Sequence, residues 1–197
     1  DADLTPVLST VITQWGIFSA TIDSLEDFEE GDRIAIPDDA SNGGRALFIL
    51  EDAGLLELSD DAGTYPTVDD IESNRLDLEL VPIAATTIPT QFDDPSLSGV
   101  VVGTSYFEPS QGIGKDDALH LDDSLAESSL PYVNVIATRA DNVDNPAWDI
   151  LADVLDDPRV ADGLEADSFG NSVLVDVSVD DLRTKLSELE DLARELQ

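Results

Sequence analysis

The sequence has no cysteine, only two lysines and a single histidine among its 197 residues. Without cysteine, the chain has no disulfide, no thiolate nucleophile and no cysteine-ligated metal site. It also has no apolar run near the roughly 18 residues that a membrane-spanning helix needs. The first twenty residues lack a basic start and a small-residue cleavage site, so no signal peptide is predicted within them.

Basic residues are scarce beside acidic ones, with 9 Lys+Arg against 44 Asp+Glu and a formal net charge of −35. Such a surface repels phosphate backbones and anionic lipid, which argues against nucleic acid and against direct membrane adsorption as partners. Two interpretations of the acidity stay open. One is a salty habitat, in which screening relieves the self-repulsion, and the other is a solvated surface that keeps the protein soluble.

The pattern of apolar residues predicts alternating strands and helices. Hydrophobic residues make up 42% of the chain, which is a globular composition, and the length fits one domain or two small lobes. Residues 7–20 are predicted to be extended, and residues 33–37 form a strand that Pro37 ends. A polar loop over 38–44 then leads to a helix over 45–53. This strand–loop–helix unit indicates a parallel α/β sheet.

The rest of the chain continues the alternation. Further strands are predicted over 76–82, 99–103, 132–139 and 172–177, and helices over 146–155 and 158–164. Residues 179–197 form an amphipathic helix with leucines along one face. These leucines are Leu182, Leu186, Leu189, Leu192 and Leu196. The helix could bind a partner, but because the leucines span barely two heptads we favour docking on its own domain.

The sequence offers little for catalysis, and no catalytic residue, metal ligand or cofactor is predicted. His120 is the only histidine, and no GxSxG motif accompanies it. Zinc would need more His or Cys. The acidic pairs, among them Asp122 and Asp123, do not follow the alternating pattern of a calcium loop. These absences argue against an enzyme.

One segment stands out as an anion site. Gly43 and Gly44 lie between a predicted strand and a predicted helix, where free backbone N–H groups and the helix dipole favour a negative charge. Arg45 follows in the first turn, and its planar guanidinium matches a carboxylate. The alternative is that Arg45 is a surface residue paired with a neighbouring Asp.

Several motifs carry a family resemblance. They are QWGIFS over 14–19, GDRIAIP over 31–37, NGGRAL over 42–47, IPTQFDD over 88–94 and SLPYVNVI over 129–136. In order and spacing, from residue 4 to residue 165, the chain resembles the methionine-binding, NlpA-type lipoproteins, which are substrate-binding proteins of methionine ABC importers.

The resemblance implies an α/β fold of the periplasmic-binding-protein type, a two-lobed clamp with mixed or parallel sheets and a first lobe incomplete at its N-terminus. Residues 1–19 would be the crossover and a remnant of lobe 1. Residues 20–102 would form lobe 2. Residues 103–178 would form the second crossover and the C-terminal part of lobe 1, and residues 179–197 the amphipathic helix that the family lacks.

The resemblance also implies a ligand site in the cleft between lobes. Arg45 resembles the arginine that holds the ligand carboxylate, and Asn134 an asparagine that contacts the amino-acid backbone of the ligand. Tyr106 aligns with the tyrosine after the second crossover strand. Gly103 stands where the family has a second asparagine, so Thr104 is a candidate substitute.

Asn42 and Gly44, which precede Arg45, complete the predicted ligand-binding set. The function implied is capture of L-methionine, a related amino acid or a short peptide outside the cytoplasm, and its delivery to an ABC-transporter permease. Membrane attachment would come only from a lipid anchor upstream of this chain. The alternative is a degenerate or repurposed binding-protein fold that acts as a protein-interaction module.

Overall fold

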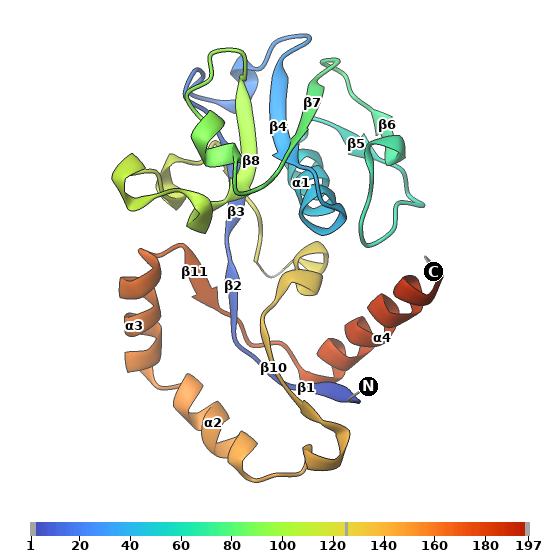
Figure 1. Ribbon diagram of the computed structural model, residues 1–197, viewed down its shortest axis with the longest axis vertical. Helices are drawn as coiled ribbons and strands as arrows, with labels where there is room; N and C mark the ends of the chain where they lie inside the picture. The colour runs from blue at the N-terminus through green and yellow to red at the C-terminus, as the bar shows by residue number, and fades with distance from the viewer. Residues whose placement is uncertain (1–2, 125, 196–197) are drawn as a thin grey trace. The chain divides into compact units, whose positions relative to one another are not determined.

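The computed structural model describes residues 3–124 and 126–195, which form two compact units (Figure 1). Unit 1 comprises Asp1–Ile12 and Ser124–Gln197, and unit 2 comprises Thr13–Asp123. The chain therefore starts in unit 1, passes into unit 2 after Ile12 and returns after Asp123. The predicted α/β class is confirmed. The predicted lobe boundaries at residues 20, 102 and 178 stay a prediction.

Unit 2 is built on a five-stranded mixed sheet. Its strands lie in the order β7 (Glu79–Ile83), β4 (Arg33–Pro37), β8 (Gly99–Gly103), β3 (Trp15–Phe18) and β9 (His120–Leu121). Strand β4 runs parallel to β7 and β8, whereas β3 runs antiparallel to β8 and β9. The parallel strands predicted from the strand–loop–helix pattern are therefore present.

Alternation along the central strands gives unit 2 a core on each face of its sheet. Ile34 and Ile36 of β4 join one hydrophobic cluster, while Ala35 between them joins the other. In β8, Val101 belongs to the first cluster and its two valine neighbours to the second. This is the period-two pattern of a strand buried on both faces, as predicted for residues 99–103.

Helix α1 (Ala40–Asp52) packs on the first cluster through Ala46, Leu47 and Leu50, all of which are fully buried. It ends where Gly54 adopts a left-handed conformation with φ of 70°, a conformation that commonly terminates helices. A two-stranded antiparallel sheet of β5 (Glu57–Leu58) and β6 (Ile71–Ser73) follows.

Among its described residues, unit 1 contains two small sheets and three α-helices. Its strands are β1 (Leu4–Ser9), β2 (Val11–Thr13), which leads into unit 2, β10 (Val135–Arg139) and β11 (Ser172–Leu174). Strand β1 pairs antiparallel with β10, and β11 pairs with β2. The helices are α2 (Ala147–Leu155), α3 (Pro158–Ser168) and α4 (Val179–Glu195). Helices α2 and α3 have no buried residue, so unit 1 is less densely packed than unit 2.

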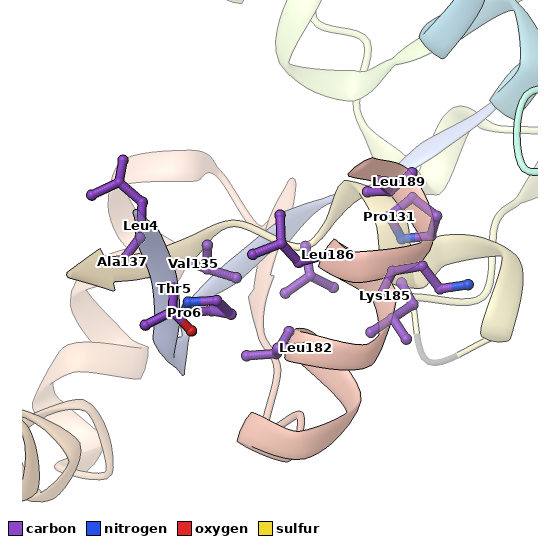
Figure 2. A pocket seen from close by; sticks show the side chains of 12 residues that line it. Leu4, Thr5, Pro6, Pro131, Val135, Ala137, Leu182, Lys185, Leu186 and Leu189 are labelled. Atoms are coloured by element: carbon purple, nitrogen blue, oxygen red, sulfur yellow. The ribbon is translucent and has the colours of Figure 1, made fainter. Parts of the chain in front are cut away.

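Helix α4 docks on the β1–β10 ribbon of its own unit. Figure 2 shows Leu182, Leu186 and Leu189 of this helix directed toward β1 and β10 across an apolar groove of about 210 Å³. Leu182 is 5% exposed, and Arg183 Nε donates to Thr5 Oγ1 at 3.2 Å. This agrees with the favoured docking of the terminal helix. Leu196 lies outside the described residues.

Most predicted elements are found, with shifted ends. Strand β7 begins at Glu79 rather than at residue 76, because Asn74 forms a tight turn instead. The Asn74 side chain accepts from Leu78 N at 2.9 Å and donates to Leu78 O at 3.0 Å, and Asp77 between them has φ of 47°. The acidic segment over residues 108–131, for which no strand is predicted, contains the edge strand β9.

Candidate functional site

Arg45 lies in the second turn of α1, and only 5% of its surface is exposed. Its guanidinium makes a charge-assisted contact with Asp122. Nε donates to Asp122 Oδ2 at 3.0 Å, and Nη2 contacts the same oxygen. Nη2 also donates to Thr13 O at 3.0 Å. The predicted alternative of an Arg–Asp pair is therefore present, but it is buried rather than on the surface.

Asp122 follows the edge strand β9, and its side chain is 6% exposed. Its second oxygen, Oδ1, accepts from Trp15 N at 2.9 Å, and Asp122 N donates to Trp15 O at 2.9 Å. Both carboxylate oxygens thus have donors. A buried ion pair is tolerated when its remaining polar atoms are also satisfied, and here they are.

Trp15 forms one wall of this site. The Arg45 Cζ atom lies 5.2 Å from the centroid of the indole ring, which is the geometry of a cation–π contact. Tyr106 meets the same ring edge-on, with ring centroids 5.9 Å apart and an interplanar angle of 77°. The structure therefore brings the predicted residues Arg45 and Tyr106 to the same indole.

Gly103 and Thr104 border the indole at the end of β8. Gly103 pairs with Trp15 across the β3–β8 ladder. Thr104 is buried, and both its N and its Oγ1 donate to Gln14 O at 3.0 Å. The Thr104 hydroxyl therefore fixes the backbone beside Trp15. We name this cluster of Arg45, Asp122, Trp15, Tyr106 and Thr104 the guanidinium site.

The prediction of a glycine loop at the mouth of the helix is wrong. Helix α1 begins at Ala40, so Gly43 and Gly44 lie inside it. Asp39 caps the helix by accepting from Asn42 N at 2.9 Å, and its backbone carbonyl accepts from Gly43 N at 2.8 Å. The N–H groups of Asn42 and Gly43 are thus used within the helix and its cap.

Close packing explains the two glycines. A Cβ atom at residue 43 would lie 2.9 Å from Pro37 O, and one at residue 44 would lie 3.0 Å from the Cα of Tyr65. A hollow of about 260 Å³ lies beside them, with Asp38 and Asp39 in its wall, and Arg45 is not among its lining residues. The electrostatics of this hollow do not favour an anion.

Asn42 and Asn134 are each engaged in local hydrogen bonds. Asn42 is half-buried, and its Nδ2 donates to the capping Asp39 Oδ2 at 3.0 Å. Asn134 belongs to unit 1, where its N and its Nδ2 both donate to Val11 O, at 2.9 and 3.1 Å. Asn134 is exposed, and its side chain secures the segment before β10.

The residues that sequence reasoning missed are Asp122 and Trp15 as partners of Arg45, along with the carbonyl of Thr13. The sequence distinguished Asp122 only as half of an acidic pair with Asp123, one of several such pairs in the chain. Its distinguishing feature is the edge strand β9, which turns it inward. A two-residue strand within an acidic connection leaves too short a pattern to detect.

Two further observations concern the described part of the chain. Within residues 3–124 and 126–195, no three His, Asp or Glu side chains gather closely enough to hold a metal ion. None of the helices described there combines the length and the apolar character needed to cross a membrane.

Two α/β units joined by two crossovers, with the mixed sheet of unit 2, are the architecture that this chain shares with solved two-lobed binding proteins. The family follows from the sequence: the model of the NlpA lipoproteins matches residues 1–175, and the chain belongs to that family. Helix α4 lies beyond the matched residues.

Similar proteins carry the names of methionine-binding lipoproteins. The D-methionine-binding lipoprotein MetQ of Escherichia coli K12 is 35% identical over 127 residues, which are 64% of this chain and 45% of that protein. Lipoprotein 28 of the same strain is 28% identical over 170 residues, which cover 86% of this chain and 61% of that protein. The chain thus spans about half the length of such relatives.

Solved structures agree with this assignment. A methionine-binding protein MetQ superposes with a TM-score of 0.71 at 28% identity, covering 90% of this chain and 71% of that one. A nutrient-binding protein from Burkholderia cenocepacia bound to methionine gives a TM-score of 0.68 at 29% identity, covering 88% of this chain and 70% of that one. Both of these structures carry the names of binding proteins.

Proposed function

We propose that this chain is an extracytoplasmic substrate-binding protein that captures methionine, or a related amino acid or short peptide, for an ABC importer. Membership of the NlpA lipoprotein family and the methionine-binding relatives support this function. On this proposal it is not an enzyme. It is held at the membrane as a lipoprotein and hands its ligand to a permease.

The observation that carries the proposal is the buried guanidinium of Arg45, which already holds a carboxylate. Two of its donors converge on one oxygen of Asp122, and a third contact goes to a backbone carbonyl. An arginine fixed in this way recognises the carboxylate of an amino acid by the same geometry. Burial strengthens the interaction, because little water screens it.

The other predicted ligand residues have unequal support. Tyr106 lies against the same indole as Arg45, which favours a role beside it. Thr104 has support as a residue that fixes the backbone around Gln14. Asn42 and Gly44 have less, because Asn42 donates to the capping Asp39 and Gly44 packs against a neighbouring segment. Asn134 is proposed on the family resemblance, and its exposed amide is suited to a zwitterion.

Calorimetry tests the proposal on the whole chain. L-methionine, D-methionine and a methionine dipeptide should bind, and methionine methyl ester should not, because it lacks the carboxylate. Arg45→Ala should abolish the heat. Arg33→Ala is the matched control, since Arg33 forms a more exposed pair with Glu79 at 3.3 Å and should leave the affinity unchanged. Absence of heat with every ligand, or equal affinity in Arg45→Ala, would refute the proposal.

A further inference from the structure

Asp122 places a carboxylate against Arg45, and a carboxylate is also the group by which an amino-acid ligand would bind this arginine. Its Oδ2 atom receives Nε at 3.0 Å and also contacts Nη2, so one side of the guanidinium is filled by a carboxylate of the protein itself. Both side chains are 6% exposed. A free carboxylate that approaches this side of Arg45 therefore meets an occupied position.

The pair also lies at a special place along the chain. Thr13, whose carbonyl accepts from Arg45, is the first residue of unit 2, and Asp123, the neighbour of Asp122, is the last. Arg45 thus contacts the residue at which the chain enters unit 2 and the residue just before the one at which it leaves. Because Asp122 follows an edge strand of only two residues, its displacement would break few backbone hydrogen bonds.

We propose that Asp122 is an internal competitor, whose carboxylate occupies the anion position of Arg45 and is displaced when a ligand carboxylate binds. This inference rests on the proposed function and adds a residue that sets its affinity. The exchange replaces one carboxylate by another, so the guanidinium never stays buried without a counter-ion. An unpaired buried charge is strongly unfavourable, which explains why the ligand-free chain needs Asp122.

The indole of Trp15 provides a local reporter of this exchange. Its backbone N–H donates to Asp122 and its ring stacks on Arg45, so removal of Asp122 from this position changes both contacts. The chain has two tryptophans, and Trp148 lies in unit 1. A Trp148→Phe background therefore leaves Trp15 as the single source of tryptophan emission.

The first experiment uses small carboxylates and does not depend on the natural ligand. In the Trp148→Phe background, Asp122→Ala leaves a carboxylate-sized space beside Arg45, and sodium formate should raise its melting temperature above that in sodium chloride of equal ionic strength. The formate effect should vanish in Asp122→Ala/Arg45→Gln and in the unmutated background. Asp157→Ala is the matched control, because Asp157 pairs with Arg159 on the surface. A melting temperature that is the same in both salts overturns the proposal.

The second experiment uses L-methionine and Asp122→Asn, which keeps the shape of the side chain and an acceptor for Trp15 N. We expect binding at least tenfold tighter than in the unmutated chain, with a larger change in Trp15 emission. Equal or weaker binding in a folded Asp122→Asn overturns the competitor role while leaving the proposed function intact. If methionine binds to neither protein, the proposed function fails, and the formate experiment alone decides whether Asp122 fills an anion position.

Discussion

Trp15 and Gly103 face each other across the β3–β8 ladder so closely that a Cβ atom at residue 103 would lie 2.7 Å from the indole Nε1 and 2.9 Å from Cε2. The indole therefore occupies the space that any side chain at 103 would need. This chain thus combines a glycine at 103 with a large ring opposite it. The two residues form a matched pair in the wall of the guanidinium site.

We expect Gly103→Ala to destabilise the protein by about 1–3 kcal/mol, because the methyl group overpacks a buried, rigid ring. In a Trp15→Ile background the same change should cost much less, giving a coupling energy of about 1 kcal/mol or more between the two positions. Urea unfolding, followed by circular dichroism, measures the stability of the unmutated chain, the two single variants and the double variant, which together form a double-mutant cycle. An equal cost of Gly103→Ala in both backgrounds would show that the indole does not set this limit.

Gly44 provides a second packing test. Alanine is favoured over glycine inside a helix by about 1 kcal/mol, but its Cβ would lie 3.0 Å from the Cα of Tyr65 and 3.1 Å from Pro66 Cδ. Because a backbone atom cannot rotate away, we expect the overpacking cost to prevail and Gly44→Ala to lower the urea midpoint. Gly63→Ala, which meets no atom within 4 Å, should leave the midpoint unchanged or raise it slightly.

The contrast between these glycines shows what the sequence could and could not predict. Strands 33–37 and 99–103 follow from short apolar runs with clear ends, and both are found with those bounds. The helix start after β4 was misplaced because glycine usually marks a loop. Here Gly43 and Gly44 are instead required by close contacts with Pro37 and Tyr65, which are tertiary and leave no local pattern.

The residues of the guanidinium site also differ in whether the sequence alone could predict them. Arg45 could be identified because cations are rare in this chain and because it lies in a family motif. Its partner Asp122 could not, since pairing between residues 77 positions apart depends on which edge strand closes the sheet. Tyr106 was predicted, but its contact with Trp15 arises from the β3–β8 register.

Asp70 should titrate at an unusually low pH. Asp70 Oδ2 accepts two hydrogen bonds from Thr67, one from the backbone N at 2.7 Å and one from the hydroxyl Oγ1 at 2.9 Å. Both bonds lower the pKa of Asp70 below its usual range, and the backbone bond has the larger effect. Thr67→Ala removes only the hydroxyl bond, so the pKa of Asp70 should rise part of the way back to that of an ordinary aspartate. Thr67→Ser keeps the hydroxyl and should keep the pKa of Asp70 low. Carboxyl-carbon NMR across a pH titration measures the shift, and an unchanged pKa in Thr67→Ala would contradict the assignment.

The sign of the stability effect follows from the lowered pKa. A carboxyl group with a lower pKa in the folded state stabilises that state above the pKa of the unfolded chain, and loses this contribution as the pH falls through the folded value. The difference in stability between the unmutated chain and Asp70→Asn should therefore be largest well above the ordinary Asp pKa of about 3.9 and shrink as the pH falls below it. Urea midpoints at several pH values measure it.

Salt should stabilise the protein, because the net charge of −35 produces repulsion that counter-ions screen. Between about 0.1 and 1 M KCl we expect the melting temperature to rise by at least about 3 °C, which for a chain of this size corresponds to about 1 kcal/mol. Asp60→Asn/Asp61→Asn removes two exposed charges and should reduce this rise. A melting temperature independent of salt would favour the interpretation that the acidity serves solubility alone.

Helix α4 supplies the last test, because it lies beyond the residues that the family model matches and yet docks on the β1–β10 ribbon. Leu182 is buried at the contact, so Leu182→Ala should destabilise unit 1 by about 2–5 kcal/mol. Ser187→Ala, at an exposed position of the same helix, is the control. If Leu182→Ala leaves the unfolding midpoint unchanged but alters the elution volume of the protein, the helix serves association with a partner or a second copy instead. A destabilised monomer would show that α4 is part of the fold.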